Sequence, residues 1–408
     1  MATKGNNNSH RTLGLTFTYG VSLKQWVDQG LFDREKLIYE KHLEQAHFDK
    51  IIWFTYGCGD EKLRDQLVKE GKLDSRVQIA ESPRWARGRG LRYIYSRLIP
   101  VIYRKLCLEL DVIKSNQMAG AEVAYLISKR YATPFALRTG YTATLFYDKR
   151  IENSVGTAER LRLKLWRVYF KSLERRLYRK CDIATVSSQN DRDYVISEYG
   201  ISTDKIRVLS NYIDCELFKP LIAIETRQNN RCVCVSRLSE QKNLKNLIRA
   251  VAEVGIGLDI YGDGEQKNEL QELANQLSAD VCFKGKCAND RLPEIYNKYQ
   301  FYIIPSYYEG MPKTLLEAMA CGCICMGTNV EGIREVIQDG INGILIDEVT
   351  DGGISHGLRH IVVNGISEIE LKSMSTKAID YITMNHGLEI LAKREYGTMF
   401  ECICKRSS

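Results

Sequence analysis

The sequence predicts an α/β protein with two domains, each built on a parallel sheet. Three observations indicate this fold class. Short apolar runs alternate with longer helix-compatible stretches along most of the 408 residues, as in strand–helix repeats. The alternation lapses once, between residues 218 and 230, and then begins again. The length suits two domains, taking roughly 150 residues for each.

In the first half, we expect strands followed by helical stretches and by glycine or hydroxyl-bearing residues. The first strand is followed by Gly20 and the second by the run 56–59, Tyr-Gly-Cys-Gly. The expected strands are Leu13–Tyr19, Lys50–Thr55, Val77–Ala80, Val112–Lys114, Phe135–Arg138, Asp182–Ser187 and Ile206–Leu209. We interpret residues 1–217 as an N-terminal Rossmann-like domain, and residues 218–230 as a linker.

The second half shows the same alternation more clearly. The expected strands are Cys232–Ser236, Leu258–Tyr261, Val281–Lys284, Phe301–Pro305, Ile324–Gly327 and Gly343–Ile346. The helices between them are predicted at Asn243–Val254, Glu265–Gln276, Leu292–Tyr299, Lys313–Ala320 and Gly332–Gln338. We interpret residues 231–384 as a second Rossmann-like domain. Residues 385–408 are expected to form a C-terminal helix that returns to the first domain.

The composition favours a globular cytoplasmic protein. Apolar residues make up 44% and charged residues 27%, and no apolar run is long enough to span a bilayer. The segment Met1–His10 is polar and lacks the apolar core of a signal peptide. The thirteen cysteines are odd in number and lack zinc-binding spacing, since Cys321, Cys323 and Cys325 merely alternate. We expect free, mostly buried thiols and neither a metal nor a cofactor.

The charge is distributed unevenly. Residues 1–210 hold 37 basic and 24 acidic residues, whereas the remainder holds 21 and 27. Two segments carry much of the excess: Arg84–Lys105 has seven basic residues and no acidic one, and Arg160–Lys180 has nine and one. Both interleave apolar and aromatic residues, which suits an anionic membrane surface. Two solvated basic helices packed on the sheet are the alternative; no nucleic-acid reading module accompanies the charge.

The segment from Pro305 to Glu317 gives the sharpest prediction of a ligand site. It follows a strand, and open α/β sheets bind ligands at the carboxyl ends of their strands. Gly310 allows close backbone approach, and Pro312 suits the first turn of a helix whose free N–H groups attract anions. Residues that bind this ligand are expected here at Gly310, Met311, Pro312, Thr314 and Leu315. Glu317, about one turn into the helix, can accept hydrogen bonds from a ribose diol, and Glu309 can bind sugar hydroxyls. Two solvated glutamates on an ordinary loop are the alternative.

Four further residues are predicted at the same sheet edge. Arg237 and Lys242 follow the first strand of the second half, where both can meet a diphosphate. Gly262 follows the next strand, and Lys286 the one after, where it can lie beside a base. Helix-capping charges and tight turns explain these residues equally well when each is taken alone.

Taken in order, these motifs resemble glycosyltransferase family 4. The resemblance covers roughly residues 180–350, and an ordered set of motifs is more specific than any single one. It rests on Asn211-x-Ile213-Asp214-x-x-x-Phe218-x-Pro220, Val235-Ser236-Arg237-Leu238 with Gln241-Lys242-Asn243, Tyr261-Gly262-Asp263-Gly264, Phe283-Lys284-Gly285, Pro305-Ser306-x-x-Glu309-Gly310-x-Pro312 and Leu316-Glu317-Ala318-Met319-Ala320-x-Gly322.

The resemblance implies the GT-B fold, with two Rossmann-like domains facing a central cleft, retaining stereochemistry and no required metal. It implies that Arg237 and Lys242 neutralise the donor diphosphate, that Glu309 contacts the donor sugar and Glu317 the ribose, and that Gly20 lies near the phosphates. The sequence departs from the family at residues 137–141, Leu-Arg-Thr-Gly-Tyr, where many members carry a histidine. Gln117 and Arg138 are candidates for contacts on the acceptor side; a structural role for the arginine is the alternative.

The reaction implied is transfer of a hexose or N-acetylhexosamine from a nucleoside diphosphate sugar, with UDP as the default, to a glycan or lipid-linked acceptor in cell-surface polysaccharide synthesis. The alternatives are a nucleotide-sugar epimerase or a glycan phosphorylase on the same fold, and a non-catalytic module that binds an anionic surface. For the phosphorylase, no cofactor-binding lysine motif is found in the sequence.

Overall fold

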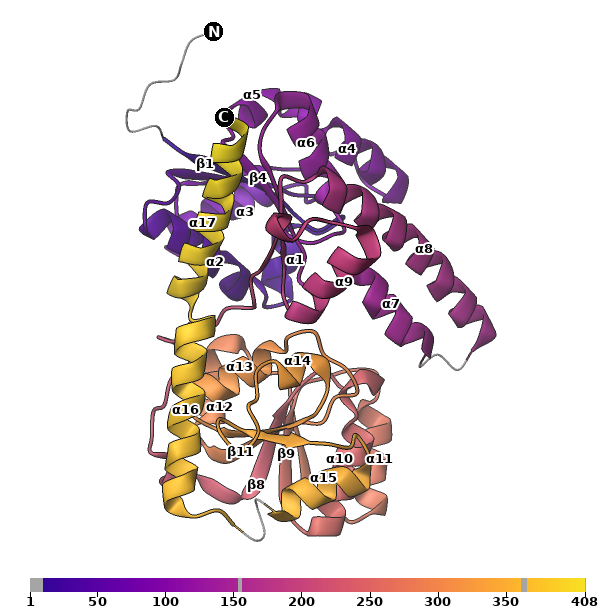
Figure 1. The fold of residues 1–408 in the computed structure, drawn as a ribbon, viewed down its shortest axis with the longest axis vertical. Helices are drawn as coiled ribbons and strands as arrows, with labels where there is room; N and C mark the ends of the chain where they lie inside the picture. Colours follow the sequence, from indigo (N-terminus) through magenta and orange to yellow (C-terminus); the bar gives the residue numbers. More distant parts are fainter. Residues whose placement is uncertain (1–9, 153–155, 361–364, 408) are drawn as a thin grey trace. The chain divides into compact units, whose positions relative to one another are not determined.

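The computed structural model describes residues 10–152, 156–360 and 365–407 (Figure 1). These residues form two compact units. Unit 1 lies within Met1–Leu209 and Ala392–Ser408, and unit 2 lies within Ser210–Leu391.

Unit 1 is built on a seven-stranded sheet in the order β3-β2-β1-β4-β5-β6-β7, in which all pairs of neighbours run parallel. The central strand, β4, is buried along its whole length, because helices cover both faces of the sheet. The strands are β1 (Thr12–Thr16), β2 (Lys50–Phe54), β3 (Val77–Ala80), β4 (Val112–Ser115), β5 (Phe135–Arg138), β6 (Ile183–Val186) and β7 (Ile206–Val208).

The helices of unit 1 connect successive strands, and the resulting strand order is typical of a doubly wound sheet. They are α1 (Leu23–Asp28), α2 (Phe32–Glu44), α3 (Asp60–Lys69), α4 (Arg89–Ile102), α5 (Arg104–Leu108), α6 (Ala121–Tyr131), α7 (Ala143–Glu152), α8 (Thr157–Lys180) and α9 (Gln189–Tyr199). Helices α7 and α8 lie side by side and project beyond the sheet (Figure 1).

Unit 2 is built on a six-stranded parallel sheet in the order β10-β9-β8-β11-β12-β13. The strands are β8 (Gln228–Val235), β9 (Gly257–Tyr261), β10 (Val281–Gly285), β11 (Tyr299–Ile304), β12 (Ile324–Thr328) and β13 (Ile344–Ile346). The helices are α10 (Leu244–Val254), α11 (Lys267–Gln276), α12 (Leu292–Tyr296), α13 (Lys313–Ala320), α14 (Glu331–Arg334), α15 (Asp351–Leu358) and α16 (Glu368–His386). Apolar cores lie on both faces of this sheet.

The prediction of two parallel α/β domains is therefore confirmed. The first strand is shorter than predicted, because it ends at Thr16 and the following residues turn into a loop. In that loop, the backbone N–H of Phe17 donates to the carbonyl of Phe54, and that of Tyr19 donates to the carbonyl of Ala119. These two hydrogen bonds fix the loop after β1 to the end of β2 and to the loop after β4.

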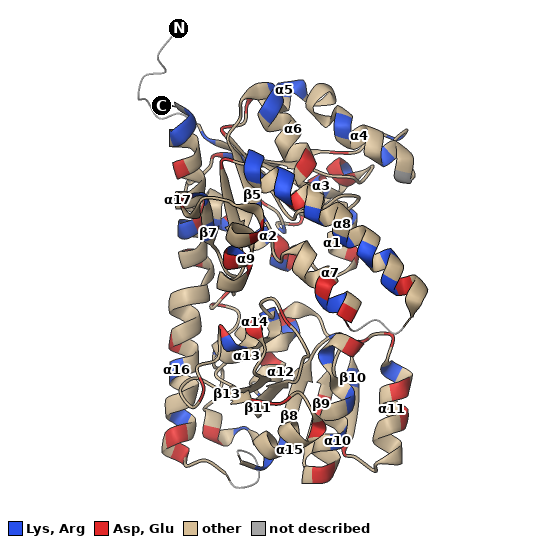
Figure 2. Cartoon of the chain, turned by 45° about the vertical axis from the view of Figure 1, so that its right-hand side comes forward, with Lys and Arg blue, Asp and Glu red and all other residues tan. Residues whose placement is uncertain are grey.

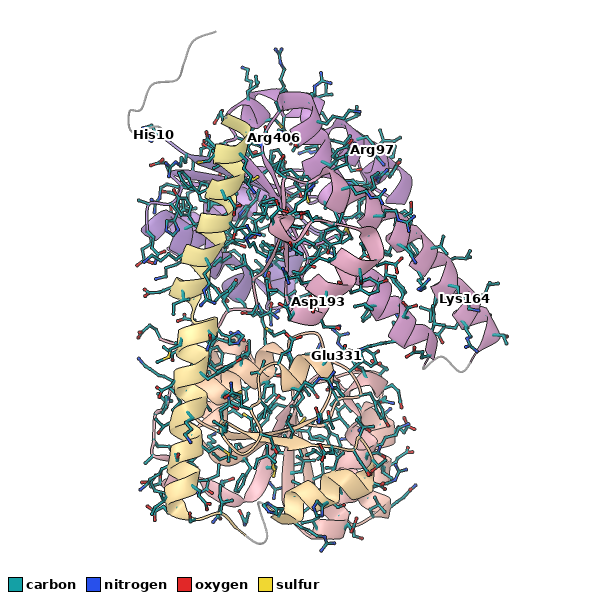
Figure 3. All side chains as sticks on the ribbon, in the orientation of Figure 1. His10, Arg97, Lys164, Asp193, Glu331 and Arg406 are labelled. Carbon is teal, nitrogen blue, oxygen red and sulfur yellow. The ribbon has the colours of Figure 1, made fainter. Side chains whose placement is uncertain are left out.

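Helix α17 (Leu388–Ser407) supplies a buried charge to unit 1. The carboxylate of Glu395 lies 2.6 Å from the ammonium of Lys114 and 3.0 Å from the ring of His42, and all three side chains are at most 8% exposed. Burial lowers the pKa of Lys114 to about 8, although the nearby carboxylate opposes this shift. Near the end of the helix, Arg406 pairs with Asp182 at 2.9 Å (Figure 3).

Two further expectations concern the whole chain. All thirteen cysteines lie within the described residues; they are free thiols, and eight are buried. Burial raises the pKa of the Cys323 thiol to about 12, so that this thiol stays protonated and unreactive. Among the residues described, no helix has both the length and the apolar character that a membrane span requires.

Candidate functional site

The loop between β11 and α13 holds the first candidate residue, Glu309. Its side chain is 7% exposed, and its carboxylate accepts hydrogen bonds from the ammonium of Lys242 and from the Ser306 hydroxyl at 2.6 Å. Ser306 is fixed in turn, because its carbonyl accepts a 2.6 Å hydrogen bond from the Thr328 hydroxyl. Glu309 is thus held in place by one partner on its own loop and one on the loop after β8, and it cannot be an ordinary solvated loop residue.

Helix α13 begins at Lys313 without a side-chain cap, after Pro312. Within its first turn, the N–H of Leu315 donates to the Pro312 carbonyl at 3.2 Å. The sequence predicts an anion site at this helix start. Thr314 is held by the Tyr302 hydroxyl, which lies 2.8 Å from the threonine oxygen. The side chain of Leu315 is fully buried, so that only its backbone can face a ligand. The carbonyl of Met311 accepts a 2.8 Å hydrogen bond from the Asn211 amide, which steadies the approach to the helix.

Glu317 lies one turn into α13 and is only 2% exposed. Its carboxylate accepts a 3.1 Å hydrogen bond from the hydroxyl of Tyr296, whose pKa is raised by burial and by the neighbouring carboxylate. A buried carboxylate is costly unless it is hydrogen-bonded, and the Tyr296 hydroxyl supplies one such hydrogen bond to Glu317.

The loop after β8 carries the two candidate cations. Arg237 is exposed, whereas the Lys242 side chain is 19% exposed and paired with Glu309. Asn243 follows in the left-handed conformation, with φ of 54°. Its amide donates to the carbonyls of Pro305 and Val349 at 2.9 and 2.7 Å and so joins the loop after β8 to the loop after β11.

A second link joins the same two loops. The backbone N–H of Tyr307 donates to the Gln241 carbonyl at 3.0 Å, and the Gln241 side-chain amide donates to the Tyr308 carbonyl at 2.8 Å. Lys242 and Glu309 meet because the two loops are fastened on either side of them. The structure therefore brings together at one sheet edge two segments that are 67 residues apart in the sequence.

The glycine after β9 is required by close packing. Gly262 has φ of 147°, and a Cβ atom there would lie 1.8 Å from the carbonyl oxygen of Ser236, in the loop after β8. No side chain fits at this position. Lys286, after β10, is 81% exposed and lies 3.8 Å from the carboxylate of Asp263. It stands at the same edge but is not fixed there.

Gly310 is exposed, with nothing close to the position of a Cβ atom, but its carbonyl meets the next element of the sheet edge. A Cβ atom on Gly332, in α14, would lie 1.9 Å from that carbonyl oxygen. The loop and α14 are thus in close backbone contact.

The three candidates in unit 1 lie on loops or strand ends of its own sheet. Gly20 has φ of 80°, and the guanidinium of Arg92 lies 3.8 Å from where its Cβ would be. The side chain of Gln117 accepts a 2.9 Å hydrogen bond from the N–H of Gly140. Arg138 is 16% exposed and lies 3.9 Å from Glu395, so it borders the buried charge cluster. This position favours the structural role that the sequence left open for this arginine.

Sequence reasoning missed the residues that support the site. Ser306 stands three residues before Glu309 in the Pro-Ser motif, and Asn243 completes the Gln-Lys-Asn run, so both were signalled by their motifs. Tyr296 lies on α12, which precedes β11, and no pattern in the sequence ties it to Glu317.

Two family models match the chain, one on each half. The model for "Glycosyl transferases group 1" matches residues 223–379, and the model for "Glycosyltransferase Family 4" matches residues 41–217. The first range contains every candidate residue of the unit 2 site.

Relatives and solved structures agree with these matches. An uncharacterized glycosyltransferase of Methanocaldococcus jannaschii is 29% identical over 45% of this chain, which spans only 52% of that protein. A Campylobacter jejuni enzyme, N-acetylgalactosamine-N,N'-diacetylbacillosaminyl-diphospho-undecaprenol 4-alpha-N-acetylgalactosaminyltransferase, is 26% identical over 66% of this chain and 72% of its own. The crystal structure of Anabaena HepE in complex with UDP and glucose has the same fold, with a TM-score of 0.69 at 16% identity over 96% of this chain and all of that one.

The family models together cover most of both units, and the two parallel sheets match the fold of solved glycosyltransferases. The chain belongs to the GT4-type glycosyltransferases and has the GT-B fold.

Proposed function

We propose that the chain is a retaining glycosyltransferase that moves a hexose or N-acetylhexosamine from a UDP-sugar to a lipid-linked or glycan acceptor in cell-surface polysaccharide synthesis. One observation carries the proposal: Arg237, Lys242 and the uncapped start of α13 lie at one sheet edge with two fixed glutamates, Glu309 and Glu317. This set matches the parts of a nucleotide sugar, namely two phosphates flanked by two sugars.

The chemistry follows from the charges. An acceptor hydroxyl oxygen attacks the anomeric carbon while the bond from that carbon to the diphosphate oxygen breaks. The bonding electrons pass to the leaving phosphate, and the acceptor proton goes to the same phosphate in a front-face displacement. Arg237, Lys242 and the N–H groups of α13 stabilise the charge that develops there, and fixed donors of this kind are usually the largest contribution to catalysis.

The identity of donor and acceptor rests on the relatives. The Anabaena structure contains UDP and glucose, and the Campylobacter enzyme is named for a diphospho-undecaprenol acceptor. We propose UDP and a lipid-linked acceptor for this chain on that basis. The functional division would be an acceptor domain at 1–217 and a donor domain at 231–384, with the linker 218–230 between them and residues 385–408 returning to the first.

An enzyme that acts on a lipid-linked acceptor must reach this acceptor at a membrane surface. Figure 2 shows Lys and Arg gathered along α8 and on α4 and α5, the helices of the two basic segments. Several apolar side chains on α4 and α8 are also more than a third exposed: Leu91, Tyr93, Ile94, Leu98, Val101, Ile102, Leu161, Leu165, Trp166, Val168 and Tyr169. Exposed apolar and basic groups together suit peripheral binding to an anionic membrane.

Calorimetry with UDP, GDP and ADP, followed by product analysis with the matching nucleotide sugars, tests the proposal. We expect UDP to bind and a glycosylated product to form from a diphosphate-linked lipid acceptor. An epimerase would instead convert the donor with no acceptor present, and a non-catalytic module would bind no nucleotide. Either result, or a reaction product with inverted anomeric configuration, contradicts the proposal.

A further inference from the structure

Unit 1 contains a cavity of about 610 Å³ between α4, α6 and α8. This volume falls in the range of small-molecule pockets, about 300 to 1,000 Å³. The cavity has two ends of different character. Its inner end is formed by residues that follow strands β1, β2 and β4, namely Tyr19, Tyr56, Ala119 and Gly120. Its outer wall is formed by apolar and aromatic side chains of α8.

The outer wall is exposed although it is apolar. Leu165 is 66% exposed, and Trp166 and Tyr169 are each 49% exposed. Tyr93 of α4, opposite in the lining, is 51% exposed. Large apolar side chains left open to water around one cavity mark a binding site more often than a packing defect.

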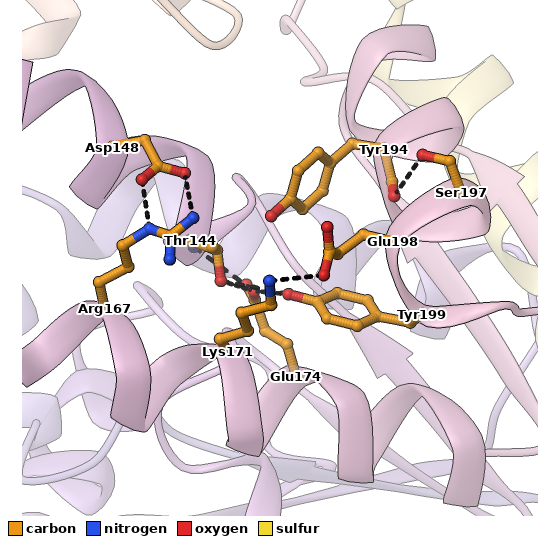
Figure 4. Close-up of polar contacts among 9 residues, drawn as sticks. All are labelled: Thr144, Asp148, Arg167, Lys171, Glu174, Tyr194, Ser197, Glu198 and Tyr199. Carbon is orange, nitrogen blue, oxygen red and sulfur yellow. Dashed lines mark hydrogen bonds and ion pairs between the residues drawn. The ribbon is translucent and has the colours of Figure 1, made fainter. Parts of the chain in front are cut away.

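The opposite face of α8 explains why this wall is held open. Ion pairs join Arg167 to Asp148 of α7, and Lys171 to Glu198 of α9 at 2.6 Å (Figure 4). Glu174, fully buried, accepts a 2.8 Å hydrogen bond from the hydroxyl of Tyr199. These contacts fix α8 from behind, so that it cannot turn and bury the aromatic face.

The inner end offers partners for an anion. The hydroxyl of Tyr56 is buried, its side chain is 5% exposed, and it has no hydrogen-bond partner among the described residues. A buried polar group in that state requires an explanation, and a phosphate oxygen that accepts its hydrogen bond supplies one. The guanidinium of Arg92 lies 3.8 Å from the Cβ position of Gly20, which follows Tyr19 of the lining, and Arg162 itself lines the cavity.

The single carboxylate of the lining does not oppose an anion. Glu122 forms ion pairs with Arg97 of α4, at 3.2 Å, and with Arg176 of α8. Its charge is therefore compensated by two arginines, and Arg97 also lies over the ring of Tyr93, 4.9 Å from the ring centroid. The net character of the cavity is an apolar channel that ends at hydroxyl and cationic groups.

We propose that this cavity binds the first part of the hydrocarbon chain of a diphosphate-bearing lipid, with the diphosphate at Tyr56 and Arg92 and the chain along Tyr93, Trp166 and Tyr169. Charge complementarity at the inner end and the open aromatic wall at the outer end together select an amphiphile of this kind. The inference rests on the proposed function, and it assigns the site where the acceptor lipid binds.

Farnesyl diphosphate is a soluble probe with both parts, and inorganic pyrophosphate lacks the chain. In calorimetry on the full chain, we expect farnesyl diphosphate to bind at least tenfold more tightly than pyrophosphate. Trp166→Ala removes aromatic contact area. It is expected to lower the affinity for farnesyl diphosphate roughly tenfold without changing pyrophosphate binding. Leu161→Ala is the matched control, because Leu161 is 62% exposed on the same helix and lies outside the cavity lining.

Tyr56→Phe distinguishes a ligand-binding hydroxyl from a structural one. It is expected to weaken both probes several-fold while the thermal unfolding temperature stays level or rises, since no internal hydrogen bond is lost. Equal binding of the two probes, equal effects of Trp166→Ala and Leu161→Ala, or binding to anionic vesicles alone would overturn the proposal.

Calorimetry with UDP on the same samples separates the two proposals. Binding of UDP without farnesyl diphosphate removes the cavity assignment and leaves the proposed function intact. Binding of farnesyl diphosphate without any nucleotide supports a lipid site and removes the proposed function.

Discussion

Lys242 and Glu309 form an ion pair between the loops after β8 and β11, with side chains that are 19% and 7% exposed. A diphosphate that reaches this lysine meets a cation already oriented by a fixed carboxylate. The pair thus holds one of the two candidate cations in place before a donor arrives, at little entropic cost on binding.

Lys242→Ala should lower kcat/KM for transfer by about 100-fold, because it removes one fixed donor from the leaving phosphate. Steady-state kinetics with the identified donor measures the loss. Lys245→Ala is the matched control: this lysine lies three residues further on and is paired with Glu269 at 2.7 Å on the surface. Equal activity in the two variants would exclude Lys242 as a residue that stabilises the leaving phosphate.

Glu317→Gln should weaken UDP binding by about tenfold or more. The amide keeps the shape of the side chain and one acceptor oxygen for Tyr296, but it loses the negative charge. Hydrogen bonds to charged groups contribute about 1.5–3 kcal/mol, against about 0.5–1.5 kcal/mol for neutral ones, so hydrogen bonds from a ribose diol should weaken. Calorimetry with UDP and with uracil separates ribose from base contacts. If the variant bound UDP as the native chain does, Glu317 would have only a structural role.

Glu395→Gln should destabilise unit 1 by about 3–5 kcal/mol, because it leaves the ammonium of Lys114 buried without a counter-charge. Chemical denaturation measures the change in the free energy of unfolding. Glu401→Gln, on the same helix, breaks a half-exposed pair with Arg207 and is expected to cost less than about 1 kcal/mol. Similar losses in the two variants would contradict the burial argument.

As the pH is lowered from 6.5 to about 4, the fold should lose stability because the pKa of His47 is lowered in the folded state. Burial, reinforced by His42 and Lys393, lowers the pKa of His47 to about 4, whereas the unfolded chain titrates near 6.5. Within this window the unfolded state binds more protons, so acidification favours unfolding. Thermal unfolding at stepped pH should show a smaller loss for His47→Gln than for the native chain or for His356→Gln, an exposed control on α15. Identical pH profiles would exclude His47 as the group responsible.

Anionic vesicles should bind the basic helices in a salt-dependent manner. Arg160 and Lys164 are exposed on α8 (Figure 3), and replacing both with glutamine should weaken binding by roughly 30-fold, at about 1 kcal/mol for each charge. Co-sedimentation with phosphatidylglycerol vesicles measures this, with Lys298→Gln in unit 2 as the control. Binding that is indifferent to salt would contradict a role for these charges.

The sequence predicted the two sheets well, and it predicted candidate residues at the strand ends, for local reasons. Buried parallel strands appear as continuous apolar runs, and the residues after them, such as Arg237 and Glu309, are read directly from each strand end. What it could not predict were pairings set by tertiary structure. The contact of Tyr296 with Glu317, the cluster of Lys114 with Glu395, and the cavity beside Trp166 each join elements whose spacing carries no shared pattern.

The position of Glu395 bears on how the protein is made. Lys114 enters the sheet early in synthesis, yet its counter-charge comes from a helix that ends at Ser407, so a ribosome must release nearly the whole polypeptide before that lysine is neutralised. Unit 1 is therefore built from two separate stretches of the sequence, and a fragment that stops at residue 209 would carry an uncompensated cation in its interior.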